Sequence, residues 1–236
     1  MRFAGHRVVG SILELAARYR DDGADELVFY DITASPARRT VDFDWVRRVT
    51  ELLDIPFCVA GGIRTVAEAE AVLEAGADKI SINSPALENP SLIDELATRF
   101  GSQCVVVGID SQRSAAGQPL AVYQYTGDVR FMRPSGRLTL DWVREVQARG
   151  AGEIVLNCMA ADGVRAGYDL AQLQAVRSIT AVPLVASGGA GCAEHFRDVF
   201  ASGVDAALAA SVFHTGSLGI TALKSYLRAE GVEVRL

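Results

Sequence analysis

The chain has 236 residues, half of them hydrophobic, which suffices for one large core, and no Pro- or Ser-rich linker divides it. We therefore expect one domain over residues 1–236, and the net charge of −6 argues against nucleic-acid binding, which needs a basic face. No signal peptide, membrane-length apolar run or CxxC spacing is present, so the sequence predicts a cytoplasmic protein with free thiols and no membrane contact.

The predicted elements alternate between amphipathic helices and short apolar strands. A helix from Ser11 to about Arg20 comes first, with apolar side chains at helical spacing and a capping box of Ser11 and Glu14. Seven runs rich in Val, Ile, Leu and Ala then read as parallel strands covered on both faces: Glu26–Asp31, Pro56–Ala60, Asp78–Asn83, Cys104–Asp110, Glu153–Cys158, Val182–Ser187 and Asp205–Ala210. Seven further helices are expected near Val41–Leu53, Thr65–Gly76, Asn89–Gly101, Thr139–Arg149, Leu170–Ser178, Ala193–Ala201 and Gly219–Glu230.

This alternation of seven strands and eight helices indicates a (β/α)8 TIM barrel, with an open doubly wound sheet as the competing fold. A barrel of this kind does not close with seven parallel strands, and the opening helix has no strand before it. We therefore expect that the first β-strand is missing from this chain, or that residues 1–9 supply it. The apolar part of that segment is short for a strand.

The two halves of the sequence repeat each other at a spacing of 127 residues. Gly23, Glu26, Pro56, Gly61, Gly62, Gly76, Asp78 and Ser84 recur as Gly150, Glu153, Pro183, Gly188, Gly189, Gly203, Asp205 and Ser211. The segment IPFCVAGG likewise returns as VPLVASGG. Two duplicated halves predict two similar chemical environments that face each other across one site.

Polar residues follow several of the predicted strands, at the barrel end where such enzymes place their chemistry. Asp31 and Asp110 each end an apolar strand, Asn83 ends a third and is followed by Ser84, and Asp162 comes after a fourth. Asp110 is the best candidate for a general acid or base, because its strand is the most apolar and partial burial would tune its pKa. The alternative is an Asp that caps nearby backbone amides.

Each glycine pair, Gly61–Gly62 and Gly188–Gly189, lies between a strand and a helix. Glycines let the backbone approach a phosphate, and helix-start N–H groups favour an anion. With Ser84 and Ser211 on the neighbouring strands, the pairs predict two phosphate sites and a substrate phosphorylated at both ends. The alternative is that the glycines serve only as turn residues. At the opposite strand ends, Glu26, Glu153 and the Asp78–Lys79 pair are expected to form a solvated or salt-bridged floor.

Several segments of the chain resemble the cyclase subunit of imidazole glycerol phosphate synthase, the HisF type, in histidine biosynthesis. The segments that carry this resemblance are ADELVFYDITAS, FCVAGGIRT, GADKISINSPAL, GSQCVVVGID, GAGEIVLN, DGVRAGYDL, VASGGAG and DAALAASVFH. They run from about residue 3 to the C-terminus, and they distinguish the chain from the sister isomerase of the same pathway.

The resemblance implies a ring closure in which ammonia from a glutaminase subunit attacks a bis-phosphorylated ribulosyl aminoimidazole carboxamide ribotide, giving imidazole glycerol phosphate and an aminoimidazole carboxamide ribotide. Asp110 matches a catalytic aspartate of the family, and no metal or cofactor is expected. Substrate contacts match Asp31, Gly61, Gly62, Asn83, Ser84, Asp162, Gly163, Ser187, Gly188, Gly189, Ala210 and Ser211. Three members of the family's charged gate for ammonia correspond to Glu26, Lys79 and Glu153.

The family's first strand carries a second catalytic aspartate, a lysine and the arginine of the gate, and none of these has a position in this chain. Impaired turnover is the expectation, since losing one acid–base partner costs about 10²–10⁴-fold. One alternative is a noncatalytic barrel that binds the glutaminase or a bisphosphate ligand. Another is a related cyclase in sugar or nucleotide amidation. The DNA just upstream distinguishes the enzyme from the binding protein. An in-frame stretch that encodes a short apolar strand would support the enzyme, and a stop codon would support the binding protein.

Overall fold

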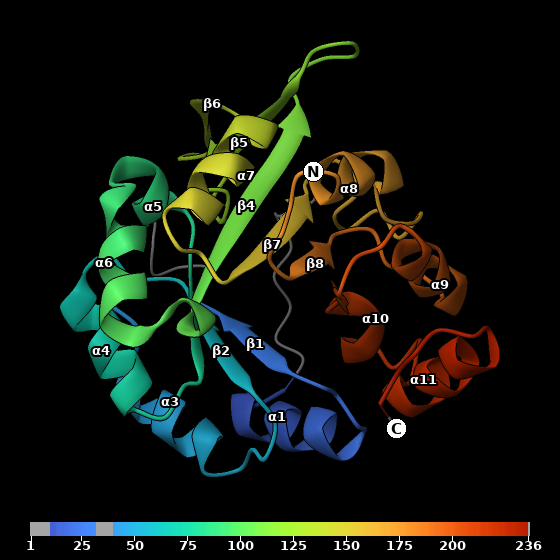
Figure 1. The fold of residues 1–236 in the computed structure, drawn as a ribbon. Coiled ribbons are helices and arrows are strands. Elements are labelled where there is room, and N and C mark those ends of the chain that lie inside the picture. Colours follow the sequence, from blue (N-terminus) through green and yellow to red (C-terminus); the bar gives the residue numbers. More distant parts are fainter. Residues whose placement is uncertain (1–9, 32–39, 236) are drawn as a thin grey trace.

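Seven parallel strands form one curled sheet in the computed structural model, which describes residues 10–31 and 40–235 (Figure 1). Their order in the sheet follows the chain: β1 (Leu27–Tyr30), β2 (Phe57–Ala60), β3 (Lys79–Ile82), β4 (Val105–Arg113), β7 (Glu153–Cys158), β8 (Leu184–Ser187) and β9 (Ala206–Leu208). All seven predicted strands are confirmed, and the curled parallel sheet with helices outside it is the predicted (β/α)8 barrel type. The segment of residues 1–9, which the sequence offered as a substitute strand, lies outside the described residues.

The eight predicted helices are also present. They are α1 (Ile12–Asp21), α3 (Phe43–Thr50), α4 (Val66–Glu74), α6 (Ser91–Phe100), α7 (Thr139–Ala148), α8 (Leu170–Arg177), α9 (Ala193–Ala201) and α11 (Ile220–Ala229). Three short helices add to them: α5 (Ser84–Glu88), η1 (Ser102–Cys104) and α10 (Ser211–His214). The described helices include none with the length and apolar character that crossing a membrane requires.

Side-chain caps fix the start of the helices that the sequence marked. The Ser11 hydroxyl accepts the Glu14 N–H at the start of α1. At α4, Thr65 accepts the Glu68 N–H, and the Glu68 carboxylate accepts the Thr65 N–H, which completes the capping box. These bonds hold the loop that leads from β2 into α4.

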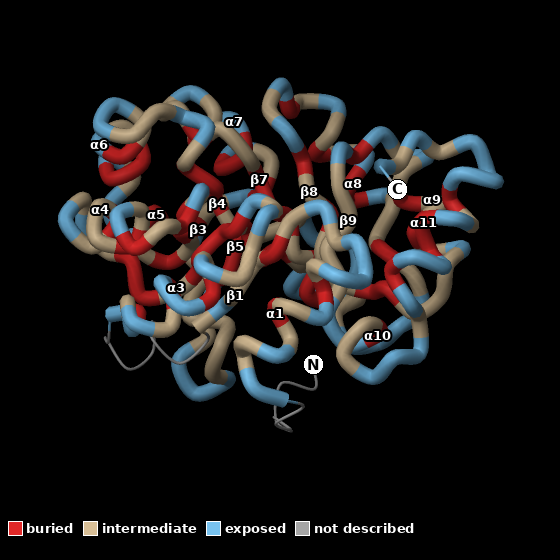
Figure 2. Tube along the Cα trace, turned by 90° about the horizontal axis from the view of Figure 1, so that it is seen from below, coloured by how far each residue is buried: buried red, intermediate tan, exposed pale blue. Residues whose placement is uncertain are grey.

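The inner strands β2, β3, β4 and β7 are largely buried on both faces, as a parallel sheet between helices and barrel interior requires. On β4, Val105, Val107 and Ile109 belong to the large core between sheet and helices, whereas Val106 faces inward with Cys58 and Val155. Buried residues accordingly run through the centre of the molecule in Figure 2. Burial raises the pKa of the Cys58 thiol well above its usual range, so this cysteine acts as a small apolar side chain.

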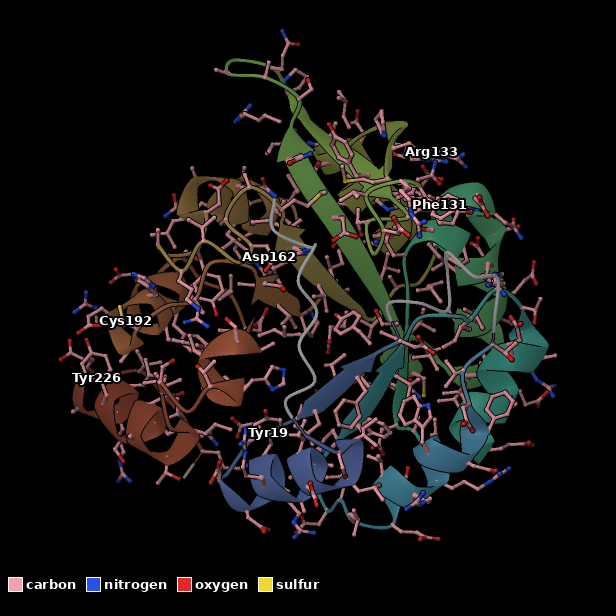
Figure 3. The ribbon with its side chains drawn as sticks, turned by 180° about the vertical axis from the view of Figure 1, so that it is seen from behind. Tyr19, Phe131, Arg133, Asp162, Cys192 and Tyr226 are labelled. Atoms are coloured by element: carbon pink, nitrogen blue, oxygen red, sulfur yellow. The ribbon has the colours of Figure 1, made fainter. Side chains whose placement is uncertain are left out.

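A β-hairpin extends β4 beyond the barrel. Its strands, β5 (Leu120–Gln124) and β6 (Arg133–Leu138), pair antiparallel with β4 and with each other. The hairpin forms here because β4 continues to Arg113 and offers an edge for pairing. The turn between β5 and β6 folds back toward α5, where Phe131 and Arg133 lie (Figure 3).

The first and last strands of the sheet, β1 and β9, are not paired with each other among the described residues. Helix α1 crosses this seam. Arg18 Nη2 donates to the Phe213 carbonyl at 3.1 Å, and the Tyr19 hydroxyl is hydrogen-bonded to His214 Nδ1 in α10. Just beyond α1, Lys224 Nζ of α11 binds the Asp25 carboxylate at 2.8 Å. Within the described chain, helices rather than strand hydrogen bonds join the two edges.

Candidate active site

Asp110 lies near the outer end of β4, and its side chain points into the barrel mouth. Its carboxylate is buried, at 8% relative exposure, and accepts three hydrogen bonds. Thr126 Oγ1 lies 2.5 Å and Asn83 Nδ2 lies 2.7 Å from Oδ2, and Asn157 Nδ2 lies 2.8 Å from Oδ1. Burial raises the pKa of Asp110 although the three donors oppose that shift. The group is thus held in one orientation and is easier to protonate than an exposed aspartate.

Neighbouring strands bring amide and hydroxyl groups to the same level of the barrel. The strand register places Asn157 beside Asp110, and Ser187 beside Asn157. The Ser187 hydroxyl donates to Asn157 Oδ1 at 3.5 Å. The side-chain oxygen of Asn83, Oδ1, is buried and has no hydrogen-bond partner among the described residues. An acceptor of this kind can receive an N–H or O–H group of a bound molecule.

Asp162 brings a second carboxyl group toward this mouth from the loop after β7 (Figure 3). Burial raises the pKa of Asp162, the charge of Asp110 raises it further, and the Gly163 N–H opposes both. The neighbouring loop is close, since a Cβ atom at Gly188 would lie 3.3 Å from the Asp162 Cβ. The two carboxyl groups therefore influence each other electrostatically within one site.

The glycine pairs have positive φ angles throughout: +98° and +73° at Gly61 and Gly62, and +90° and +115° at Gly188 and Gly189. Close backbone approach requires glycine as well, because a Cβ atom at Gly61 would lie 2.4 Å from the Asp31 carbonyl oxygen. The turn-residue explanation of the glycines therefore has a structural basis, and their phosphate-binding role stays a prediction.

The helix starts after the two glycine pairs differ. At α4 the Glu68 carboxylate already accepts the N–H groups of Arg64 and Thr65, at 2.7 and 3.1 Å. At α9 no side chain caps the helix start, although His195 Nδ1 accepts the Gly191 N–H at 3.1 Å. The sequence predicted two matching phosphate sites, and the structure gives α4 a capping box that α9 lacks.

Ser84 and Ser211 occupy matching places as the first residues of α5 and α10. The residues before them share an unusual backbone, with φ −132° and ψ −88° at Asn83 and φ −122° and ψ −64° at Ala210. Their surroundings differ, because Ser84 is buried whereas Ser211 is exposed. Ser84 Oγ also accepts the Tyr125 N–H at 2.9 Å.

The sequence repeat is also a repeat of hydrogen bonds. Asp78 Oδ2 accepts the Phe57 N–H at 2.8 Å, and Asp205 Oδ2 accepts the Leu184 N–H at the same distance. Both members of each pair are offset by 127 residues, since 78 + 127 = 205 and 57 + 127 = 184. The two halves therefore support their strands in the same way at the end opposite Asp110.

A charged cluster lies at that opposite end of the barrel interior. Lys79 Nζ binds Glu26 Oε2 and Glu153 Oε2, each at 2.7 Å, and all three side chains are mostly buried. Burial disfavours the Lys79 ammonium, but hydrogen bonds to the two carboxylates outweigh it and raise the pKa of Lys79. Burial raises the pKa of Glu26 despite the lysine. The predicted salt-bridged floor is confirmed as a geometry, whereas a role in ammonia passage stays a prediction.

Sequence reasoning missed the turn residues Tyr125 and Thr126, which touch the Ser84 and Asp110 side chains. It also gave no role to Tyr30, at the end of β1. The signal for the turn was indirect: β5 pairs with the end of β4 so that Tyr123 lies opposite Asp110, and the next residues fold back over the mouth. The described residues contain no group of three or more His, Cys, Asp or Glu side chains suited to a metal ion.

Replacing Gly189 by Ala is expected to destabilise the chain by about 3 kcal/mol or more. The positive φ and a Cβ only 2.1 Å from the Gly167 carbonyl oxygen both oppose the substitution. Gly23→Ala is the matched control, since Gly23 has φ +88° and an added Cβ would meet nothing within 4 Å. That variant should lose about 1 kcal/mol, from the backbone strain alone. Urea unfolding of both variants measures the difference, and equal losses would contradict the close approach.

The fold and site define a parallel barrel protein with a buried carboxyl group at one mouth, glycine loops around it and a charged floor. A family model described as "Histidine biosynthesis protein" matches residues 1–219. Over all 236 residues the chain is 62% identical to the imidazole glycerol phosphate synthase subunit HisF of Tolumonas auensis and covers 92% of that relative's length. It is 63% identical to the subunit of the same name from Xanthomonas campestris pv. campestris, covering 91% of it, and 60% identical to that from Aeromonas hydrophila, covering 92%. The chain therefore belongs to the histidine biosynthesis family, in which it has the role of a HisF-type cyclase subunit.

Proposed function

We propose that the chain uses ammonia from a glutaminase subunit to convert a bis-phosphorylated ribulosyl aminoimidazole carboxamide ribotide. Ammonia would attack the ketone of this substrate, water would leave to form an imine, and the imine would close to the imidazole of imidazole glycerol phosphate with release of the aminoimidazole carboxamide ribotide. The observation that carries the proposal is the buried Asp110 carboxyl group at a mouth with two repeated glycine loops.

In this proposal Asp110 transfers protons during imine formation and ring closure. Its raised pKa makes Asp110 easier to protonate than an exposed aspartate, which helps a group that must both accept and release a proton. Asn83 Oδ1 would accept a hydrogen bond from a substrate N–H or O–H group, and Asp162 with Gly163 would contact the sugar or phosphate from the second half. Holding the substrate at both ends would align the reacting ketone, which is a positioning contribution.

The two glycine loops would each bind one phosphate group. Gly61, Gly62 and Ser84 would form the first cradle, and Gly188, Gly189, Ala210 and Ser211 would form the second. The second loop has the stronger case on backbone donors, because α9 starts without a side-chain cap. Asp31 and Ser187 would line the mouth between these loops and Asp110.

Ammonia would enter from the floor, where Lys79 binds Glu26 and Glu153. The interior between this floor and Asp110 contains Cys58, Val106 and Val155, which are apolar and buried. Such a lining suits passage of neutral ammonia better than passage of ammonium. A glutaminase subunit bound under this floor would deliver ammonia without release to solvent.

The test is to incubate the full chain with the bis-phosphorylated substrate and an ammonium salt, without a glutaminase, and to quantify both products by chromatography. Formation of imidazole glycerol phosphate and the aminoimidazole carboxamide ribotide in equal amounts supports the proposal. Substrate binding with no product would instead favour the noncatalytic barrel. The rate against that of a relative also tests the predicted impairment of turnover.

A further inference from the structure

The turn after β5 touches both halves of the candidate site through two consecutive residues. The Tyr125 N–H donates to Ser84 Oγ at 2.9 Å, and the Thr126 hydroxyl donates to Asp110 Oδ2 at 2.5 Å. Ser84 belongs to the first glycine cradle, and Asp110 is the acid–base candidate. One short segment thus connects a predicted phosphate contact with the carboxyl group.

Side-chain contacts hold this turn in a strained conformation. Tyr125 has φ +57°, which is rare for a bulky residue. Its hydroxyl donates to the Glu88 carboxylate of α5, and the Arg133 guanidinium lies 5.1 Å from its ring centre. These partners anchor the turn to the helix that Ser84 begins, so a movement of α5 would reach Thr126 directly.

The directions of these hydrogen bonds determine which hydroxyl groups can still donate to a ligand and which protonation state of Asp110 is favoured. Ser84 Oγ accepts from Tyr125, which leaves its own hydroxyl hydrogen to donate to an anion. Thr126 donates to Asp110, which favours the carboxylate over the protonated acid. A ligand that orders Ser84 would therefore also order the donor on Asp110.

We propose that the Tyr125–Thr126 turn is a positioning element that couples occupancy of the Ser84 site to the Asp110 carboxyl group. This inference rests on the proposed function for its biological meaning, whereas the contacts themselves do not depend on it. Asp162 and Tyr30 experience the charge of Asp110, and the Thr126 hydroxyl donates to Asp110 rather than to either of them. Removing the Thr126 hydroxyl should therefore act on Asp110 alone.

The first test follows the Asp110 side-chain carboxyl by carbon-13 NMR titration, with the signal assigned from Asp110→Asn. Thr126→Val should raise the midpoint by about one pH unit, because a hydrogen bond to the charged form is lost. Thr126→Ser, which keeps the hydroxyl, should restore the wild-type midpoint. Ser135→Ala is the matched control, since Ser135 Oγ donates to the Val122 carbonyl and accepts the Arg137 N–H, both within the same hairpin. An unchanged midpoint in Thr126→Val would overturn the proposal.

The second test separates the coupling from a local effect. Ser84→Ala should raise the Asp110 midpoint in the same direction, whereas Ser211→Ala, its counterpart in the second half, should leave it unchanged. The double variant Ser84→Ala/Thr126→Val should shift no further than Thr126→Val, because both act along one path. Additive shifts, or equal effects of both serine variants, would overturn the coupling.

Turnover with ammonia distinguishes failure of this inference from failure of the proposed function. We expect Thr126→Val to lower kcat at neutral pH with little change in KM, and Ser211→Ala to raise KM alone. If the wild type is active but Thr126→Val leaves the Asp110 midpoint unchanged, only the positioning role is refuted. A wild type that forms no product but shows the titration shifts would refute the proposed reaction and keep the coupling.

Discussion

Replacing Asp110 by Asn is expected to lower turnover with ammonia by about 10²–10⁴-fold, the usual contribution of one acid–base group. The fold should survive, because the site can accommodate the new amide. Asn83 can turn its side-chain amide over, so that its unpaired Oδ1 accepts from the new NH₂ group. The Thr126 hydroxyl can reorient in the same way. Steady-state kinetics on Asp110→Asn, with the solvent-exposed Asp141→Asn of α7 as control, measures the effect.

The same variant should change how stability depends on pH. The folded-state pKa of Asp110 is raised above its unfolded value by burial, so the stability linked to its protonation is present below the unfolded pKa. That stability is lost as pH rises through the folded pKa. Asp110→Asn should therefore be at least as stable as the wild type near neutral pH and should gain less on acidification. Urea unfolding across this pH range measures the difference, and identical pH profiles of the variant and the wild type would contradict a raised pKa at Asp110.

Replacing Lys79 by Met is expected to destabilise the chain by about 2–4 kcal/mol, because it leaves two mostly buried carboxylates without their cation. The side chains of Glu26 and Glu153 retain 27% and 15% exposure, which keeps the cost below that of a fully buried pair. Lys224→Met is the matched control, since its partner Asp25 is 56% exposed and can return to water. The control should lose about 1 kcal/mol.

The loss in Lys79→Met should depend on pH and on the carboxylates. Burial already raises the pKa of Glu26, so acidification protonates it and removes most of the repulsion. The destabilisation should therefore be largest at high pH and shrink as pH falls. Adding Glu26→Gln and Glu153→Gln to Lys79→Met should recover most of the lost stability, whereas strictly additive losses would contradict a coupled cluster.

The sequence predicted the barrel well because its strands are continuous apolar runs between capped helices. That pattern follows from burial on both faces of a parallel sheet. It placed Asp110 at the end of its strand, whereas in the structure β4 continues beyond Asp110 to Arg113. The short helices α5 and α10 escaped prediction, since a few residues carry no helical period. Their first residues, Ser84 and Ser211, were nevertheless identified through the repeat.

Long-range contacts set the limit of sequence reasoning in the site. Thr126 lies 16 residues after Asp110 and reaches it only because β5 folds back along β4. The glycine pairs could not be divided between turn and anion roles from the sequence, because a positive φ and close backbone approach satisfy both. Only the structure shows that Gly61 and Gly189 must be glycine whether or not an anion binds.

The contacts of α1 between β1 and β9 affect where the molecule opens locally. Strands inside the sheet are tied by rows of backbone amides, whereas β1 and β9 are joined, in the described chain, through the side chains of α1 and its neighbours. Local opening costs least where backbone bonds do not have to break. Among the described residues, opening at this edge would therefore break the contacts of Arg18, Tyr19 and Lys224 and no strand-to-strand hydrogen bond.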